Sequence, residues 1–68
     1  MQILKETTEV LNNGHQRVTR IIEIDGEGVT FSYDFSADSF VTASSAVDIA
    51  TIVDETFETL VLDYQDGV

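Results

Sequence analysis

The stretch QRVTRIIEIDGEGVTFSYDF, residues 16–35, decides the fold of this chain. Apolar and polar side chains alternate on both sides of a central Asp-Gly-Glu-Gly segment, residues 25–28, which is typical of two antiparallel strands joined by a turn. A four-residue loop at 25–28 predicts four facing pairs on one almost wholly apolar face: Ile24 with Val29, Ile22 with Phe31, Arg20 with Tyr33, and Val18 with Phe35. The other face is mostly polar, and carries Arg17, Thr19, Ile21, Glu23, Thr30, Ser32 and Asp34.

A second hairpin precedes this one. In Asn12-Asn13-Gly14, a three-residue loop places the glycine in the left-handed position that ends a type I turn with a bulge. That register predicts five pairs: Leu11 with His15, Glu9 with Arg17, Thr7 with Thr19, Glu6 with Arg20, and Leu4 with Ile22. Two acid–base pairs and a threonine pair favour the hairpin, since each contributes about 0.2–1 kcal/mol. The alternative is a short N-terminal helix with Gly14 as its C-cap, which gives an αββα order.

The C-terminal third predicts a long helix. Residues 36–43 contain a turn at Asp38-Ser39 and either a short strand or an extended link at 40–42. Ser45 is a good N-cap, with Asp48 three residues on to complete a capping box, and the helix ends near Gln65. Its apolar positions fall on one arc at 100° per residue: Ala46, Ile49, Ala50, Val53, Phe57, Leu60, Val61 and Tyr64.

The sequence therefore predicts one α+β domain over residues 1–68. A three-stranded antiparallel meander, with strands at about 3–11, 16–24 and 29–35, is followed by one helix on its apolar face (βββα). A chain of 68 residues buries only roughly 60% of its unfolded surface. Because it has no cysteine, disulfides and thiolate metal sites are excluded, and self-association as a homodimer is one way to add stability.

No residue pattern indicates an enzyme. His15 is the one histidine and lies beside a turn, where a solvated role is usual; Ser44 and Ser45 lack a nucleophile context. Asp25, Glu27, Asp34 and Asp38 do not match the spacing of a calcium loop, and the single G-x-G at 26–28 encloses a glutamate that repels phosphate. We expect no metal and no cofactor.

Arg20 stands on the predicted apolar face, between Glu6 and Tyr33. A buried guanidinium needs partners, so the main interpretation is an Arg20–Glu6 ion pair with the arginine stem packed under the helix. The alternative is that Arg20 lies at an open edge and helps to hold a partner.

The charge distribution carries the functional prediction. After Arg20 no Lys or Arg occurs to the end of the chain, and the net charge is −10. This charge argues against binding nucleic acid or an anionic membrane and favours a basic partner. The absence of a signal peptide pattern or a long apolar run indicates a cytoplasmic protein.

Acidic residues follow the outer face of the predicted helix. Asp48, Glu55 and Asp66 share one line, and Asp54, Glu58 and Asp63 flank it. Acids near the helix C-terminus oppose the helix dipole, so helix stability does not explain them. Their spacings along the axis, about 5–16 Å at 1.5 Å per residue, overlap those of nucleic acid phosphates. A solvated face of an acidic domain is the equally weighted alternative.

In size, charge and strand–helix order the chain resembles phage-encoded DNA-mimic proteins, including some anti-CRISPR inhibitors. The resemblance implies an inhibitor that occupies the nucleic-acid-binding surface of a CRISPR nuclease, a restriction enzyme or another DNA-binding protein. The phosphate mimics would be Asp48, Asp54, Glu55, Glu58, Asp63 and Asp66 on the helix, with Asp25 and Glu27 on the turn.

Two other classes of function stay open. One is a self-assembling module in which the edge of the third strand, residues 29–35, pairs with another chain. The other is a domain from a salt-loving organism, in which the acids serve solubility only. Such a domain should gain stability steeply with molar salt, whereas a mimic should fold without it.

Overall fold

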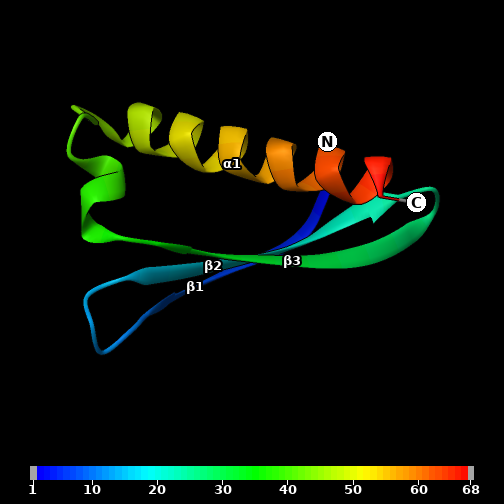
Figure 1. Ribbon diagram of the computed structural model, residues 1–68, viewed down its shortest axis with the longest axis horizontal. Coiled ribbons are helices and arrows are strands. Elements are labelled where there is room, and N and C mark those ends of the chain that lie inside the picture. Colours follow the sequence, from blue (N-terminus) through cyan, green and yellow to red (C-terminus); the bar gives the residue numbers. More distant parts are fainter. Residues whose placement is uncertain (1, 68) are drawn as a thin grey trace.

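The computed structural model describes residues 2–67, which form three strands and a long helix in the predicted βββα order (Figure 1). The elements are β1 (Ile3–Val10), β2 (Gln16–Ile24), β3 (Glu27–Phe35), the 3₁₀ helix η1 (Ala37–Phe40) and α1 (Ala46–Asp66). The sheet is an antiparallel meander in the order β1-β2-β3, with α1 on one face. The α+β prediction is confirmed, and the alternative with an N-terminal helix is wrong because residues 3–10 are a strand.

The first hairpin forms around Gly14, as predicted. Gly14 has φ +84°, and its backbone N–H donates to the carbonyl of Leu11, while the Leu11 N–H donates to the carbonyl of His15. Strands β1 and β2 then pair in the predicted register: Glu9 with Arg17, Thr7 with Thr19, and Glu6 with Arg20. The local turn chemistry and the cross-strand charges agree here, so the register follows from the sequence.

The pairing of Leu4 with Ile22 is wrong. The register shifts between Ile3 and Lys5, so that Ile3 faces Ile22 and Lys5 faces Ile21. An extra residue in one strand turns the next side chain to the other face. Leu4 accordingly lies beside Ile21 on the face away from the helix, where a Cβ added to Gly28 would stand 3.0 Å from Ile21 Cγ2 and 3.4 Å from Leu4 Cδ1.

The second turn is two residues shorter than predicted. Asp25 and Gly26 have φ of +53° and +84°, and β3 starts at Glu27 rather than at 29. The true pairs, all two residues away from those predicted, are Ile24 with Glu27, Ile22 with Val29, Arg20 with Phe31, and Val18 with Tyr33. A two-residue turn in which both residues have positive φ matches the right-handed twist of the flanking strands, and this match favours it over a four-residue loop. Glu23 supports it, since its Oε1 accepts a 2.7 Å hydrogen bond from the Gly26 N–H.

The core lies between β2, β3 and α1 despite this error. Because side chains alternate with a period of two, a two-residue shift leaves every side chain on its predicted face. The buried apolar residues are Val18, Ile22, Phe35, Val53 and Phe57. On the opposite face Thr19 Oγ1 and Ser32 Oγ are 2.9 Å apart, as expected of a polar surface.

Residues 36–43 form η1 and a turn, and not the short strand considered at 40–42. Phe40, at the end of η1, places its ring 5.4 Å from that of Phe35 and so closes one end of the core. The helix then begins as predicted: Ser45 Oγ accepts a hydrogen bond from the Asp48 N–H at 3.2 Å. The carboxylate of Asp48 bonds to Ser44 rather than to the Ser45 backbone, so the capping box is shifted by one residue.

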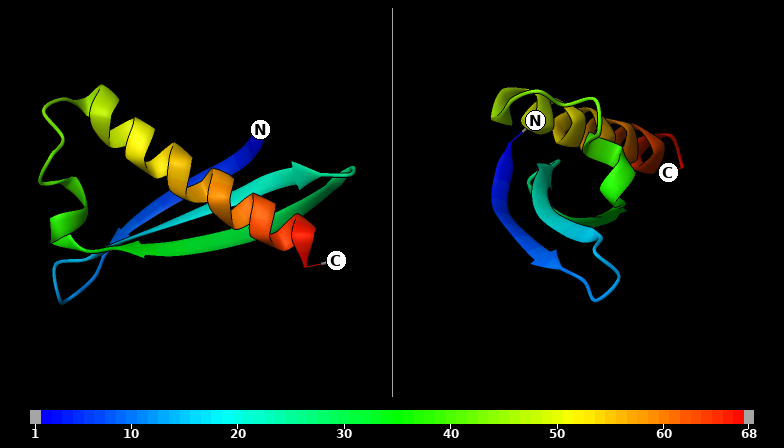
Figure 2. Two further views of the ribbon diagram at one scale, coloured as in Figure 1. Left: turned by 45° about the horizontal axis from the view of Figure 1, so that its top comes forward. Right: turned by 90° about the vertical axis from the view of Figure 1, so that its left-hand side faces the viewer.

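The helix crosses the strands obliquely and does not cover the whole sheet (Figure 2). On its predicted apolar arc Val53 and Phe57 are buried and Leu60 and Val61 are half-buried, whereas Ile49 and Tyr64 remain 42% and 44% exposed. Every residue of β1 is exposed. The helix therefore covers the central strand β2 best, while β1 and β3 form the two edges of the sheet and β1 is exposed throughout.

Candidate partner-binding surface

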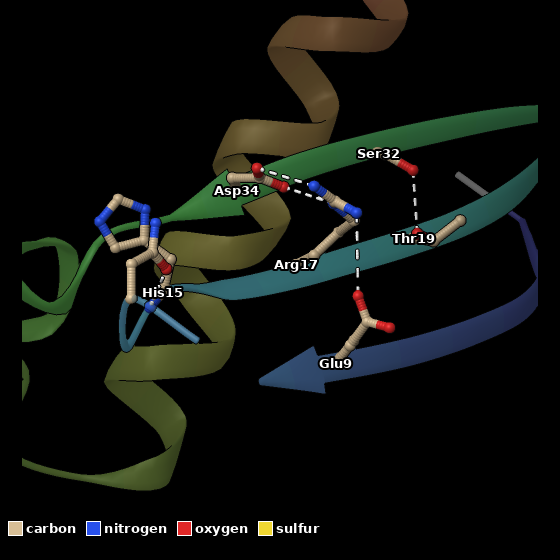
Figure 3. Close-up of polar contacts among 7 residues, drawn as sticks. Glu9, His15, Arg17, Thr19, Ser32 and Asp34 are labelled. Atoms are coloured by element: carbon tan, nitrogen blue, oxygen red, sulfur yellow. Dashed lines mark hydrogen bonds and ion pairs between the residues drawn. The ribbon is translucent and has the colours of Figure 1, made fainter. Parts of the chain in front are cut away.

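Arg17 is used within the sheet. Its Nε and Nη2 donate to the two carboxylate oxygens of Asp34 at 2.8 and 3.2 Å, and its Nη1 lies 3.8 Å from Glu9 Oε1 (Figure 3). The hydrogen bond from Arg17 lowers the pKa of Asp34, and the same bond raises the pKa of Arg17. This cation thus compensates two acids on the face of the sheet away from the helix.

Arg20 is used between the sheet and the helix. Its side chain is only 6% exposed, its Nε donates to Glu6 Oε2, and its Nη2 donates to Asp54 Oδ1 at 2.8 Å. The guanidinium carbon lies 4.8 Å from the centre of the Phe57 ring, a cation–π distance. The predicted pair with Glu6 is present, but Tyr33 is not the cross-strand neighbour of Arg20, since Phe31 faces it.

Asp54 is the partner of Arg20 that sequence reasoning missed. The sequence pattern groups it with the acids that flank the outer line of the helix, although its position beside the apolar arc is a signal that it could reach the sheet. In the structure its carboxylate is an acceptor for an internal cation. Its charge is compensated within the fold.

Asp48 also has an internal role. Its Oδ2 accepts hydrogen bonds from the Ser44 N–H at 3.0 Å and from Ser44 Oγ at 2.8 Å. Both bonds lower the pKa of Asp48, and the bond from the Ser44 backbone N–H has the larger effect. The residue stays charged at neutral pH, but it lies in the first turn of α1, at the end of the helix opposite to Asp63 and Asp66.

The remaining four helix acids have no such partners. Glu55, Glu58, Asp63 and Asp66 are exposed, and within residues 2–67 their carboxylates make no hydrogen bond or ion pair. The last turn of α1 carries no basic residue. Free carbonyl groups at a helix C-terminus add partial negative charge, so the field at this end is of one sign.

The fold brings the acidic turn to the same end of the molecule. Asp25 and Glu27 line an open depression together with Tyr64 and Gln65 of the last turns of α1. Figure 1 shows the β2–β3 turn beside the C-terminal end of the helix. We call this region the acidic end. It comprises Asp25 and Glu27 of the turn and the exposed Asp63 and Asp66 of the last turns of α1, with Glu58 and Glu55 further along the same helix.

Tyr64 holds the helix over β3 at this end. Its ring meets that of Phe31 edge to face, with ring centres 5.7 Å apart. Aromatic pairs in this geometry contribute about 0.5–1.5 kcal/mol beyond their buried area. The contact fixes the last turns of α1 relative to the turn that carries Asp25 and Glu27.

Other kinds of site find little support in residues 2–67. No group of three or more His, Asp or Glu side chains in this part of the chain is placed to hold a metal ion. The one long helix is too polar to cross a membrane. His15 is half-buried next to the first turn, where its backbone N–H donates to Asn13 Oδ1 at 3.0 Å.

Comparisons with protein-family models, with curated proteins and with solved structures gave no match to this chain.

Proposed function

We propose that this protein is a small inhibitor or regulator that occupies the basic, nucleic-acid-binding surface of another protein. The observation that carries the proposal is the acidic end, where the β2–β3 turn and the last turns of α1 meet without a basic residue. The chain has one lysine and two arginines, and both arginines form ion pairs with acids away from the acidic end. The acidic end is thus left uncompensated.

The proposal narrows the predicted set of phosphate mimics. The Asp48 carboxylate binds Ser44 and that of Asp54 binds Arg20, so both already accept internal hydrogen bonds. Of the predicted phosphate mimics, those left with exposed carboxylates that can accept bonds from a partner are Asp25, Glu27, Glu55, Glu58, Asp63 and Asp66. Glu55 and Asp66 are eleven residues apart, about 16 Å along the axis.

Such a surface would act first on the rate of encounter. A field of one sign attracts an oppositely charged cleft and raises association rates steeply at low ionic strength. Arginine and lysine side chains that bind phosphates also bind carboxylates well. The partner class that fits is therefore a DNA- or RNA-binding protein of the cytoplasm, such as a CRISPR nuclease or a restriction enzyme.

Competition binding with two matched variants tests the proposal. The immobilised chain is exposed to cell lysate at 50 mM and at 500 mM salt, and bound protein is challenged with duplex DNA. Asp66→Asn removes one charge from the acidic end, whereas Asp38→Asn removes one from an exposed position outside it. Both variants have the same net charge, so they separate the location of the charge from its total.

We expect to capture a partner that DNA and 500 mM salt both displace. Asp66→Asn should weaken this capture, whereas Asp38→Asn should not. Equal loss of binding in the two variants would show that binding depends on the total charge and not on the acidic end. Binding that ignores both DNA and salt would overturn the proposal.

A further inference from the structure

Strand β1 has a free edge along its whole length. It pairs with β2 on one side, and all eight of its residues are exposed. In both views of Figure 2 the strand lies at the outside of the sheet, opposite to β3. A free edge presents backbone N–H and C=O groups that can pair with another strand.

The hydrogen-bond pattern of the first hairpin shows which residues of β1 offer these groups. Leu11 exchanges backbone bonds with the residues facing it, since it donates to His15 and accepts from Gly14. In an antiparallel pair such positions alternate, so Glu9, Thr7 and Lys5 direct their backbone groups toward β2. The groups of Glu6, Thr8 and Val10 therefore point to the free edge.

This alternation restricts how a second copy of β1 could pair. In a two-fold antiparallel arrangement, a residue whose backbone groups point to the free edge must face another such residue. Because these residues are all even-numbered, the two residue numbers of any facing pair add up to an even value. A sum of 12 sets Glu6 against its own copy and brings two like charges together. A sum of 14 sets Glu6 against Thr8, Thr7 against itself, and Lys5 against Glu9.

The register with a sum of 14 is also the one that matches the charges. Lys5 has no ion pair within residues 2–67, and Glu9 is 67% exposed with its Oε1 3.8 Å from Arg17. In this register each Lys5 faces the Glu9 of the other copy on the polar side of the sheet. The two-fold axis repeats the pair, so one dimer gains two of them.

We propose that two copies of this chain pair through their β1 strands, in the register that places Lys5 opposite Glu9, and form a continuous six-stranded sheet. In this register the side chains on the helix-covered face of one copy lie next to those on the same face of the other copy. Both helices therefore lie on the same side of the six-stranded sheet. The negative net charge of each copy opposes this association. Added salt screens the repulsion between the two copies, so dimerisation should become stronger as the salt concentration rises.

The bulge at Leu4 limits the contact to the rest of the strand. A bulge and an edge lysine are devices that often prevent pairing between edges. Here the bulge lies at the start of β1 and leaves Glu6 to Val10 in regular register with β2. The lysine that would repel a second edge has a complementary acid four residues along the same strand.

The test is a charge exchange across the proposed interface. Sedimentation or light scattering between 1 and 200 µM chain, in 150 mM salt, should show the mass rise toward twice 7.5 kDa. Lys5→Glu alone and Glu9→Lys alone each bring like charges together and should weaken dimerisation at least tenfold. An equimolar mixture of the two variants, and the double variant Lys5→Glu/Glu9→Lys, restore opposite charges and should recover the dimer.

Two controls guard the result. Glu58→Lys changes the net charge as Glu9→Lys does but lies on the helix, so it should not weaken the dimer. Hydrogen exchange should show the amides of Glu6 and Thr8 becoming protected as concentration rises. A monomer throughout the range, a dimer indifferent to both single variants, or failure of the mixture to recover it would each overturn the proposal.

Discussion

Asp54 of the helix and Arg20 of the central strand form an ion pair, with 2.8 Å between Oδ1 and Nη2. The same guanidinium binds Glu6 of β1 and lies over the ring of Phe57. One buried cation therefore joins three elements of this small fold, and its partners lie at the more exposed rim.

Replacing Arg20 tests what this cation contributes. Arg20→Ala should lower the free energy of unfolding by about 2–3 kcal/mol, because it removes a buried stem and both ion pairs. Arg20→Met keeps most of the packing and lets Glu6 and Asp54 return to water, so it should cost less, about 1 kcal/mol. Urea denaturation followed by circular dichroism gives both values, and equal costs would contradict this account.

Phe57 is the fully buried aromatic of the helix, at 0% exposure. Phe57→Ala should cost about 3–5 kcal/mol, the usual range for deleting a buried aromatic side chain, and could unfold so small a domain. Leu62→Ala is the control on the same helix, since Leu62 is 52% exposed and should cost less than about 1 kcal/mol. Chemical denaturation midpoints compare them, and a midpoint for Phe57→Ala that stays with that of Leu62→Ala would show that the helix does not pack as described.

Gly26 needs its positive φ of +84° for the two-residue turn. No atom lies within 4 Å of a Cβ added there, so Gly26→Ala should cost about 1–2 kcal/mol through backbone strain alone. Gly67 has φ −81°, and Gly67→Ala should change stability by less than about 0.5 kcal/mol. Thermal denaturation of the two variants checks the turn, and similar melting temperatures would argue for the longer loop.

Asp34 provides a test of pH dependence. Its pKa is lowered by the hydrogen bond from Arg17, so its contribution to stability is present above the unfolded pKa of roughly 3.9 and is lost as pH falls through the lower folded value. The stability difference between the wild type and Asp34→Asn should therefore be largest at neutral pH and shrink below pH 4. Urea denaturation between pH 2.5 and 7 measures it, with Asp38→Asn as the exposed control. A difference that does not change with pH would exclude the ionised pair as its cause.

Salt dependence separates a functional acidic surface from adaptation to molar salt. Since the core and the internal ion pairs of Arg17 and Arg20 do not require added salt, we expect the chain to be folded at 20 mM salt. Screening of the uncompensated acids should raise the melting temperature by only a few degrees up to 0.5 M salt. A chain that is unfolded below molar salt would favour the adaptation alternative over the proposed inhibitor.

Local chemistry in the sequence determined the order of the elements. Alternation over 16–35, the Asn-Asn-Gly loop and the Ser45 cap each act within a few residues, so they specify strands, a first register and a helix start without knowledge of the rest of the chain. The faces of the sheet followed too, because a period of two survives even a two-residue error in register.

Only the tertiary structure decided which charges remain free and how far the helix covers each strand. Asp54 is compensated because the helix lies over Arg20, and Asp25 joins the acidic end because the β2–β3 turn lies beside the last turns of α1. Strand β1 stays uncovered because the helix crosses the sheet obliquely. These are relations between residues far apart in the chain, set by sheet twist and by the packing of Phe57 and Tyr64, and no local pattern records them.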